Sequence, residues 1–132
     1  MRIGRGDNFL SIEKIDPAEP YSQWRLEAVA SDSGQRFTAI NDRLVLDTSD
    51  KTIQQFAEFE SMKAQRVEIS LTEGGWVRLE RDARGQITVS YRVAGWKVRA
   101  ALKGEVVVNG EFADACCREL GELLAGGRVA GL

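Results

Sequence analysis

The most regular pattern of the chain is an alternation of apolar and polar residues between 66 and 103. The segment reads RVEISLTE, GGWVRLERD, ARGQITVSYRVA and GWKVRAALK, with turn residues between the alternating runs. Apolar residues at every second position are typical of strands that bury one face. Turns this short join only neighbouring strands, so the pattern predicts an antiparallel meander, extended by a short β run at 106–108.

Two strands are predicted nearer the N-terminus, at 8–15 and 24–31. In the second of them alternate residues are apolar, namely Trp24, Leu26, Ala28 and Ala30. Prolines at 17 and 20 predict a loop between the two strands, because each proline fixes φ and restricts the residue before it. The polar segment 1–7, which contains two glycines, is expected to be loose.

A hairpin is predicted to join the second of these strands to a third one at 36–42. The intervening Asp-Ser-Gly sequence at 32–34 supplies the residue types that tight turns need. In this arrangement Phe37 and Ala39 face the core. The apolar run at 44–46 either continues the third strand past a bulge or begins another strand.

Two helices are predicted, at about 49–64 and 111–125. The first has a start signal, Thr-Ser-Asp at 48–50, whose side-chain oxygens can accept hydrogen bonds from the first turn. The second is followed by a Gly-Gly pair, which favours a helix C-terminus. Three- and four-residue spacing predicts the buried faces: Ile53, Phe56, Ala57, Phe59 and Met62 in the first helix, and Phe112, Cys116, Leu120, Leu123 and Leu124 in the second.

Together these elements predict a single α+β domain over 1–132, with loose termini at 1–7 and 126–132. One antiparallel meander sheet of about six to seven strands would carry both helices on one face and leave its other face open. The sequence shows no internal repeat. A chain of 132 residues is long enough for one domain with its own hydrophobic core.

Composition disfavours two kinds of partner. The net charge is −2 and the isoelectric point is about 5.3, so no bulk positive field attracts nucleic acid. No stretch approaches the roughly 20 apolar residues of a membrane span, and the N-terminus lacks the apolar run of a secretory signal. We therefore expect a cytoplasmic protein that binds neither nucleic acid nor membranes.

The absence of histidine limits the available chemistry. Histidine is the commonest general base and metal ligand, so Ser–His and Cys–His catalysis and histidine-ligated metals are excluded. The adjacent Cys116 and Cys117 are expected to be reduced, because neighbours on a helix point about 100° apart and cannot complete a disulfide framework or a metal site. We expect Cys116 in the core and Cys117 exposed and oxidisable, and we expect no cofactor and no metal.

The polar face of the meander holds the candidate binding residues. Arginine outnumbers lysine by 13 to 5, and arginine and tryptophan dominate protein-binding hot spots. Trp76 has the parity of the polar residues, whereas Trp24 and Trp96 have the parity of the core. The alternative is that the charges merely form a stabilising lattice of cross-strand ion pairs in water. The predicted partner-binding residues are Trp76, Arg78, Glu80, Arg92 and Arg99.

The order of elements over about 44–125 resembles small bacterial domains that include the WapI-type immunity proteins. The resemblance is carried by the helix with FAEF, the hairpin GGWVRLERDARGQITVSYRV, the segment GWKVRAALKGEVVV and the closing helix FADACCRELGELL. Asp82, Gly85, Ile87 and Val89 fit the D-x-x-G-x-h-x-h hairpin pattern of that group, in which h is apolar. The resemblance implies a non-enzymatic protein that binds and blocks a toxin domain and uses no cofactor.

Two other functions are compatible with the sequence. A small acidic secretion chaperone or homodimeric scaffold fits the size and charge, and the oligomeric state is left open. Such chaperones usually begin with a helix, whereas 8–15 alternates like a strand. A carboxylate-dependent enzyme is the third alternative, because several carboxylates are candidates for acid–base pairs: Asp7, Glu13, Asp42, Asp47, Glu68, Glu80 and Asp82.

Overall fold

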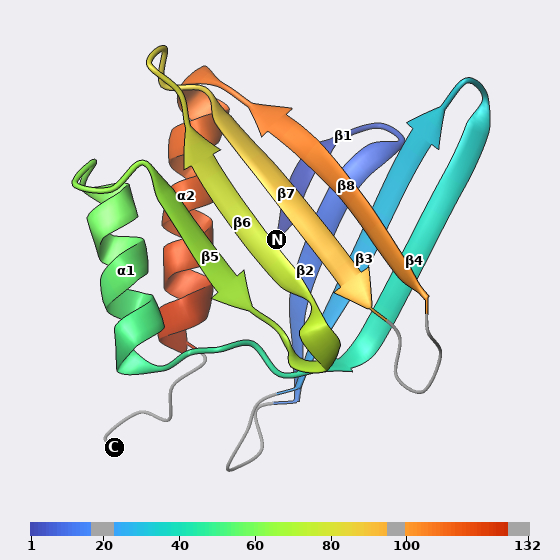
Figure 1. Cartoon of the computed structure of the whole chain (residues 1–132), viewed down its shortest axis with the longest axis horizontal. Coiled ribbons are helices and arrows are strands. Elements are labelled where there is room, and N and C mark those ends of the chain that lie inside the picture. The colour runs from blue at the N-terminus through green and yellow to red at the C-terminus, as the bar shows by residue number, and fades with distance from the viewer. Residues whose placement is uncertain (17–22, 95–99, 127–132) are drawn as a thin grey trace.

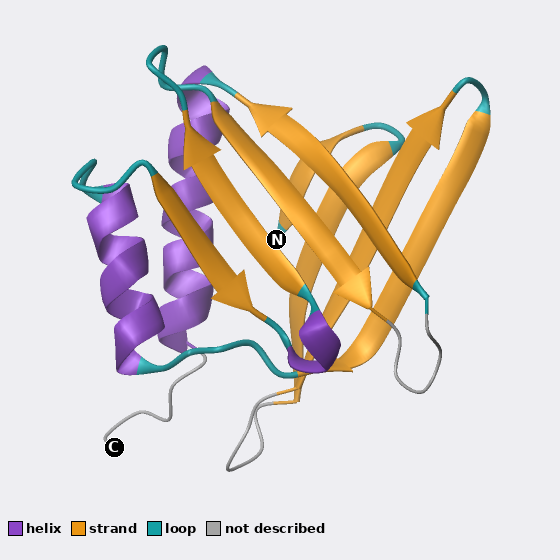
Figure 2. Ribbon diagram, viewed as in Figure 1, coloured by secondary structure: helices purple, strands orange, loops and turns teal. Residues whose placement is uncertain are grey.

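The computed structural model describes residues 1–16, 23–94 and 100–126, and it has an α+β architecture (Figure 1). Four strands and a helix follow one another twice along the chain (Figure 2). The first half contains β1 (Arg2–Arg5), β2 (Asn8–Asp16), β3 (Gln23–Asp32), β4 (Gln35–Leu44) and α1 (Asp50–Glu60). The second contains β5 (Arg66–Ser70), the short 3₁₀ turn η1 (Thr72–Gly74), β6 (Trp76–Arg81), β7 (Ile87–Ala94), β8 (Ala101–Val108) and α2 (Gly110–Gly126).

The strands form two antiparallel sheets, so the prediction of one sheet of six to seven strands is wrong. The first sheet has the order β1-β2-β3-β4 and the second has the order β5-β6-β7-β8. Helix α1 separates β4 from β5 in the chain. Among the described residues, an isolated antiparallel bridge between Leu46 and Leu71 joins the segment after β4 to the segment after β5. The apolar run at 44–46 therefore ends β4 and also supplies this bridge.

A single hydrophobic core lies between the sheets and the helices. The core includes residues of both sheets and of both helices, among them Trp24, Phe59, Tyr91 and Leu120. Strand β8 contacts all four strands of the first sheet, and the two helices pack together at the β5 side (Figure 1). The helices therefore do not lie on one face of a single sheet, as the sequence predicted, but complete a core that two sheets enclose.

The alternation patterns place the strands correctly. Strands β2, β3 and β4 correspond to the predicted segments 8–15, 24–31 and 36–42. The predicted turn at 32–34 is a two-residue hairpin loop, in which Ser33 and Gly34 both have positive φ angles of 51° and 80°. Such a loop matches the twist of the flanking strands. The prediction for Phe37 is wrong, because this residue near the start of β4 is 46% exposed.

The N-terminal segment differs from the expected loose lead over 1–7. Strand β1 pairs with β2 from Arg2 to Arg5, and Ile3 is buried. Gly4 has a φ of 112°, and a Cβ there would collide with the carbonyl oxygen of Asn8. Only glycine fits this backbone without displacing the strand.

Both helices begin where the sequence predicts, but their buried faces are narrower. Helix α1 ends at Glu60, four residues early, and Met62 has a left-handed φ of 67° and is 72% exposed. In α2 the buried stripe is Ala113, Cys116, Cys117, Leu120 and Leu124, rather than one that begins at Phe112. Phe112 is 59% exposed and lies beneath the Arg5 guanidinium, which is 4.6 Å from the ring centre.

Three predictions concern residues outside the described part of the chain. These are the loop with prolines at 17 and 20, the segment 96–99 of the fourth meander strand, and the tail beyond 126. Among the described residues, β8 begins at Ala101 and continues without interruption to Val108, so the β run at 106–108 belongs to that same strand. No described helix is long and apolar enough to span a membrane.

Candidate protein-binding face

The outward face of the second sheet gathers most of the predicted binding residues. Strand register places Trp76 opposite Arg92, Arg78 opposite Ser90 and Glu80 opposite Thr88. On the other side of β6, the same register places Glu68 opposite Arg78 and Arg66 opposite Glu80. We call this surface the β5–β8 outer face, defined by Arg66, Glu68, Trp76, Arg78, Glu80 and Arg92.

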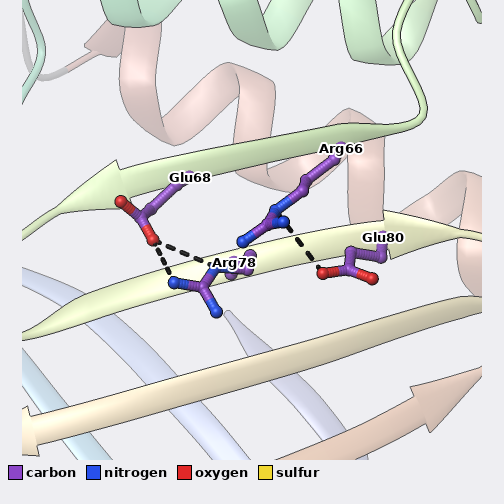
Figure 3. A network of polar contacts seen from close by, with 4 residues as sticks. All are labelled: Arg66, Glu68, Arg78 and Glu80. Carbon is purple, nitrogen blue, oxygen red and sulfur yellow. Dashed lines mark hydrogen bonds and ion pairs between the residues drawn. The ribbon is translucent and has the colours of Figure 1, made fainter.

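Two cross-strand ion pairs lie side by side on this face (Figure 3). The Arg78 Nη2 atom lies 2.6 Å from Glu68 Oε1, and Arg78 Nε donates to the same oxygen at 3.0 Å. The Nε atom of Arg66 lies 3.5 Å from Glu80 Oε1. The side chains of Arg66 and Glu80 are more than half exposed, so this pair contributes little to stability.

Arg78 also stacks on the aromatic residue of the face. Its guanidinium carbon lies 4.2 Å from the centre of the Trp76 ring, within the range of cation–π attraction. The ion pair with Glu68 and the stacking on Trp76 hold a long side chain in one conformation.

Arg92 lies on this face and also forms a hydrogen bond that holds a turn in place. Its Nη1 donates to the carbonyl oxygen of Gly74 at 2.7 Å, so it fastens the 3₁₀ turn η1 to β7. Arg99 lies outside the described residues. Four of the five predicted residues, Trp76, Arg78, Glu80 and Arg92, therefore lie on one face. Arg66 and Glu68, which complete the ion pairs, were not among the predicted partner-binding residues. The pattern that could have identified them is the pairing of opposite charges across neighbouring strands, Arg66 with Glu80 and Glu68 with Arg78, but this pairing is visible only when the strand register is known.

The carboxylates named as acid–base candidates are distributed over different parts of the molecule. Glu68 and Glu80 pair with arginines on the β5–β8 outer face. Asp82 accepts hydrogen bonds from the backbone N–H groups of Arg84 and Gln86, which fixes the β6–β7 turn. Among the described residues, no group of three or more Cys, Asp or Glu side chains is placed to hold a metal ion.

Asp47 stabilises the start of α1. Its Oδ2 accepts from the buried Thr52 hydroxyl at 2.6 Å, and its Oδ1 accepts from the Ser49 N–H at 3.0 Å. The Ser49 side chain in turn accepts from the Thr52 N–H. The hydrogen bond from Thr52 lowers the pKa of Asp47 below its ordinary value of 3.8, although partial burial acts in the opposite direction.

Replacing Asp47 with Ala is expected to lower the free energy of unfolding at pH 7 by about 1–2 kcal/mol, because the N–H of the capping residue Ser49 and the Thr52 hydroxyl both lose their acceptor. A group whose folded-state pKa is lowered stabilises the fold above its unfolded pKa and loses this effect as the pH falls. The difference in the free energy of unfolding between the wild type and the Asp47→Ala protein should therefore shrink as the pH falls below 3.8, the ordinary pKa of an aspartate. Urea denaturation across pH measures it, with the exposed Glu122→Ala as control; a constant difference down to low pH would contradict the assignment.

Both cysteines are buried, which corrects the expectation that Cys117 is exposed and oxidisable. Burial raises the pKa of Cys116 to about 12, with further contributions from Cys117 and Glu119. Burial also raises the pKa of Cys117, although the Arg81 guanidinium acts in the opposite direction. Because the thiolate is the reactive form, neither thiol is suited to nucleophilic chemistry at neutral pH.

A groove of about 540 Å³ lies apart from the predicted binding residues. Its walls are the edge strands β1 and β8 and the first turns of α2, including Arg5, Val107, Phe112 and Glu119. The groove carries both charge signs, from Arg2, Arg5, Glu105 and Glu119.

Comparison with known proteins identified no relative of this chain. No protein-family model, no curated protein and no solved structure matches this chain. The resemblance to WapI-type immunity proteins stays a prediction.

Proposed function

We propose that this chain is a non-enzymatic protein that binds a partner protein through the β5–β8 outer face. We further propose that the partner is a toxin domain, which the bound chain would occlude, as the resemblance to WapI-type immunity proteins implies. The observation that carries the proposal is the stacked Trp76–Arg78 pair on an open sheet face.

Three features of the face support recognition of a protein. Tryptophan and arginine are the residue types most enriched at the energetic centre of interfaces. Arg78 is already ordered by Glu68 and Trp76, so binding need not immobilise it. Arginines and glutamates alternate across the strands, which gives a charge pattern that favours one register of a complementary partner.

The ionisable side chains considered for chemistry are either buried in the core or engaged in ion pairs, which supports a binding role for the face. The thiols of Cys116 and Cys117 have raised pKa values and are buried. The carboxylates Glu68 and Glu80 are engaged with arginines rather than with each other. The binding residues project from a sheet, which holds them in fixed positions.

Replacing Arg78 or Trp76 with Ala is expected to weaken binding of the partner at least about tenfold, because each change removes half of the stacked pair. The proposal predicts a toxin-bearing protein encoded beside this gene, and the isolated toxin domain of that protein is the partner to use. Biolayer interferometry gives the dissociation constant, and survival of cells that co-express the toxin reports occlusion.

Arg25→Ala is the matched control for this experiment. Arg25 is also an arginine on a sheet face, and its Nη2 lies 3.9 Å from Glu27 Oε2, but it belongs to β3 in the other sheet. Its replacement should leave the dissociation constant within about twofold. Equal binding by the wild-type, Trp76→Ala and Arg78→Ala proteins would refute the proposed surface, and a neighbouring toxin that forms no complex would refute the proposed partner.

A further inference from the structure

Strand β4 is a long edge of the first sheet. It runs over ten residues, from Gln35 to Leu44, and among the described strands it pairs only with β3. Phe37 and Ile40 are 46% and 53% exposed, on opposite faces of this strand. A long edge with exposed apolar residues is a template for pairing with another strand.

The hairpin fixes which backbone groups of β4 are available. Asp32 and Gln35 close a two-residue loop, so they form a hydrogen-bonded pair, and the pairs that follow alternate. By this alternation the backbone N–H and C=O groups of Phe37 and Ala39 form hydrogen bonds with β3. Those of Arg36, Thr38 and Ile40 point away from the sheet. The register shifts between Leu26 and Trp24, which marks a bulge after Asn41 and the end of the regular edge.

The charges along this edge are self-complementary. Arg36 and Asp42 are both exposed, and neither has an ion-pair partner among the described residues. If two copies of β4 pair antiparallel about an axis through Ala39, Arg36 of each copy lies level with Asp42 of the other, the residue at which the bulge begins, so the ion pair closes the end of the regular ladder. The same register places Thr38 opposite Ile40, so the outward-directed backbone groups of both copies meet.

The apolar residues fit this register as well. Ile40 of each copy lies diagonally across the axis from Ile40 of the other, at a spacing that long side chains bridge. Phe37 of each copy lies opposite Asn41 of the other, and Asn41 Nδ2 donates to the carbonyl oxygen of Ala94 in β7. The end of the second sheet therefore lies next to the position that the Phe37 ring would occupy.

We propose that this protein forms a homodimer through antiparallel pairing of two β4 strands, centred on Ala39 and fixed by reciprocal Arg36–Asp42 ion pairs. The first sheets of the two copies, each with the order β1-β2-β3-β4, then form one eight-stranded sheet. The surface is separate from the β5–β8 outer face, because β4 belongs to the other sheet. Dimerisation would thus present two partner-binding faces on one particle.

Charge exchange tests the proposal. The full chain at about 100 µM should sediment as a dimer, since self-association depends on protomer concentration. Arg36→Asp alone and Asp42→Arg alone each place like charges opposite one another twice per dimer, and each should raise the dimer dissociation constant at least about tenfold. The double variant Arg36→Asp/Asp42→Arg restores opposite charges and should recover dimerisation. Arg84→Asp, at the exposed β6–β7 turn, is the matched control and should dimerise like the wild type.

A cysteine crosslink tests the axis independently. Ala39 of the two copies would form a non-hydrogen-bonded pair with Cα atoms about 4.5 Å apart, a spacing that a disulfide accepts. Ala39→Cys should give a crosslinked dimer on mild oxidation, whereas Ser31→Cys on β3 should not. The native thiols are buried and should not interfere. A wild-type monomer at this concentration, a dimer that the double variant fails to restore, or no crosslink at position 39 would each overturn the proposal.

Discussion

Replacing Phe59 with Ala is expected to lower the free energy of unfolding by about 3–5 kcal/mol, because a large buried aromatic ring is lost and the surrounding core closes only in part. Phe59 is fully buried in α1, and its ring centre lies 6.2 Å from that of Phe56. The Arg81 guanidinium stacks on the same ring at 4.3 Å and donates to the Phe59 carbonyl oxygen at 2.8 Å. The substitution therefore also removes the platform that orders Arg81 at the end of the helix.

Urea denaturation measures this effect, and Met62→Ala is the matched control. Both residues were predicted to belong to the apolar face of the first helix, but Met62 is 72% exposed. Its replacement should change the free energy of unfolding by no more than about 0.5 kcal/mol. Since domains of this size are stable by about 5–15 kcal/mol, the Phe59 variant should unfold at a much lower urea concentration. Equal effects at the two positions would contradict the observed end of α1.

Replacing Gly104 with Ala is expected to cost about 1–3 kcal/mol of stability, the range found when a packed core is overfilled. Gly104 in β8 lies opposite Tyr91 in β7, and the buried Tyr91 ring occupies the space above it. A Cβ at Gly104 would lie close to the phenol oxygen and 2.7 Å from Cζ, so the ring must move. The adjacent strands and the core restrict that movement.

A double-mutant cycle distinguishes this clash from other effects of the substitution. Tyr91→Leu removes the ring that occupies the space and leaves a cavity, so it destabilises by itself. In the Tyr91→Leu protein, Gly104→Ala should cost less than it does in the wild type, and the coupling energy should be about 0.5–3 kcal/mol. Additive effects in denaturation experiments would show that the Tyr91 ring is not the cause.

Sequence patterns predicted the local elements because their signals act over a few residues. Alternation identified β2, β3 and the buried residues Val67, Val77 and Val89, and the capping residue Ser49 located the start of α1. These signals depend on the period of side-chain direction and on hydrogen bonds to nearby backbone groups. Neither requires knowledge of the remaining chain.

The candidate face was predictable in outline for the same reason. Residues of one parity in neighbouring strands of a meander share a face, so Trp76, Arg78, Glu80 and Arg92 meet as expected. Their interactions were not predictable, because these depend on register and rotamers. The ion pair between Arg78 and Glu68 and the bond from Arg92 to Gly74 needed three-dimensional positions.

Arg81 illustrates an interaction that no local pattern indicated. It ends β6, yet it stacks on Phe59 and donates to its carbonyl oxygen, 22 residues earlier in the chain. Carbonyl groups at a helix end need donors, and the Phe59 carbonyl accepts from the Met62 N–H as well as from Arg81 of the neighbouring sheet. The sequence offered only a charged residue at the end of an alternating run.

By itself the sequence determined where strands and helices form, which face of each strand is apolar, and that the given chain contains no histidine. Only the tertiary structure decided that the eight described strands divide into two sheets, that β1 joins the first of them, and that Met62 and Phe112 lie outside the core. The physical reason is that alternation reports a buried face but not what covers it. A strand face is equally apolar whether helices or a second sheet pack against it, and the choice depends on contacts between residues far apart in the chain.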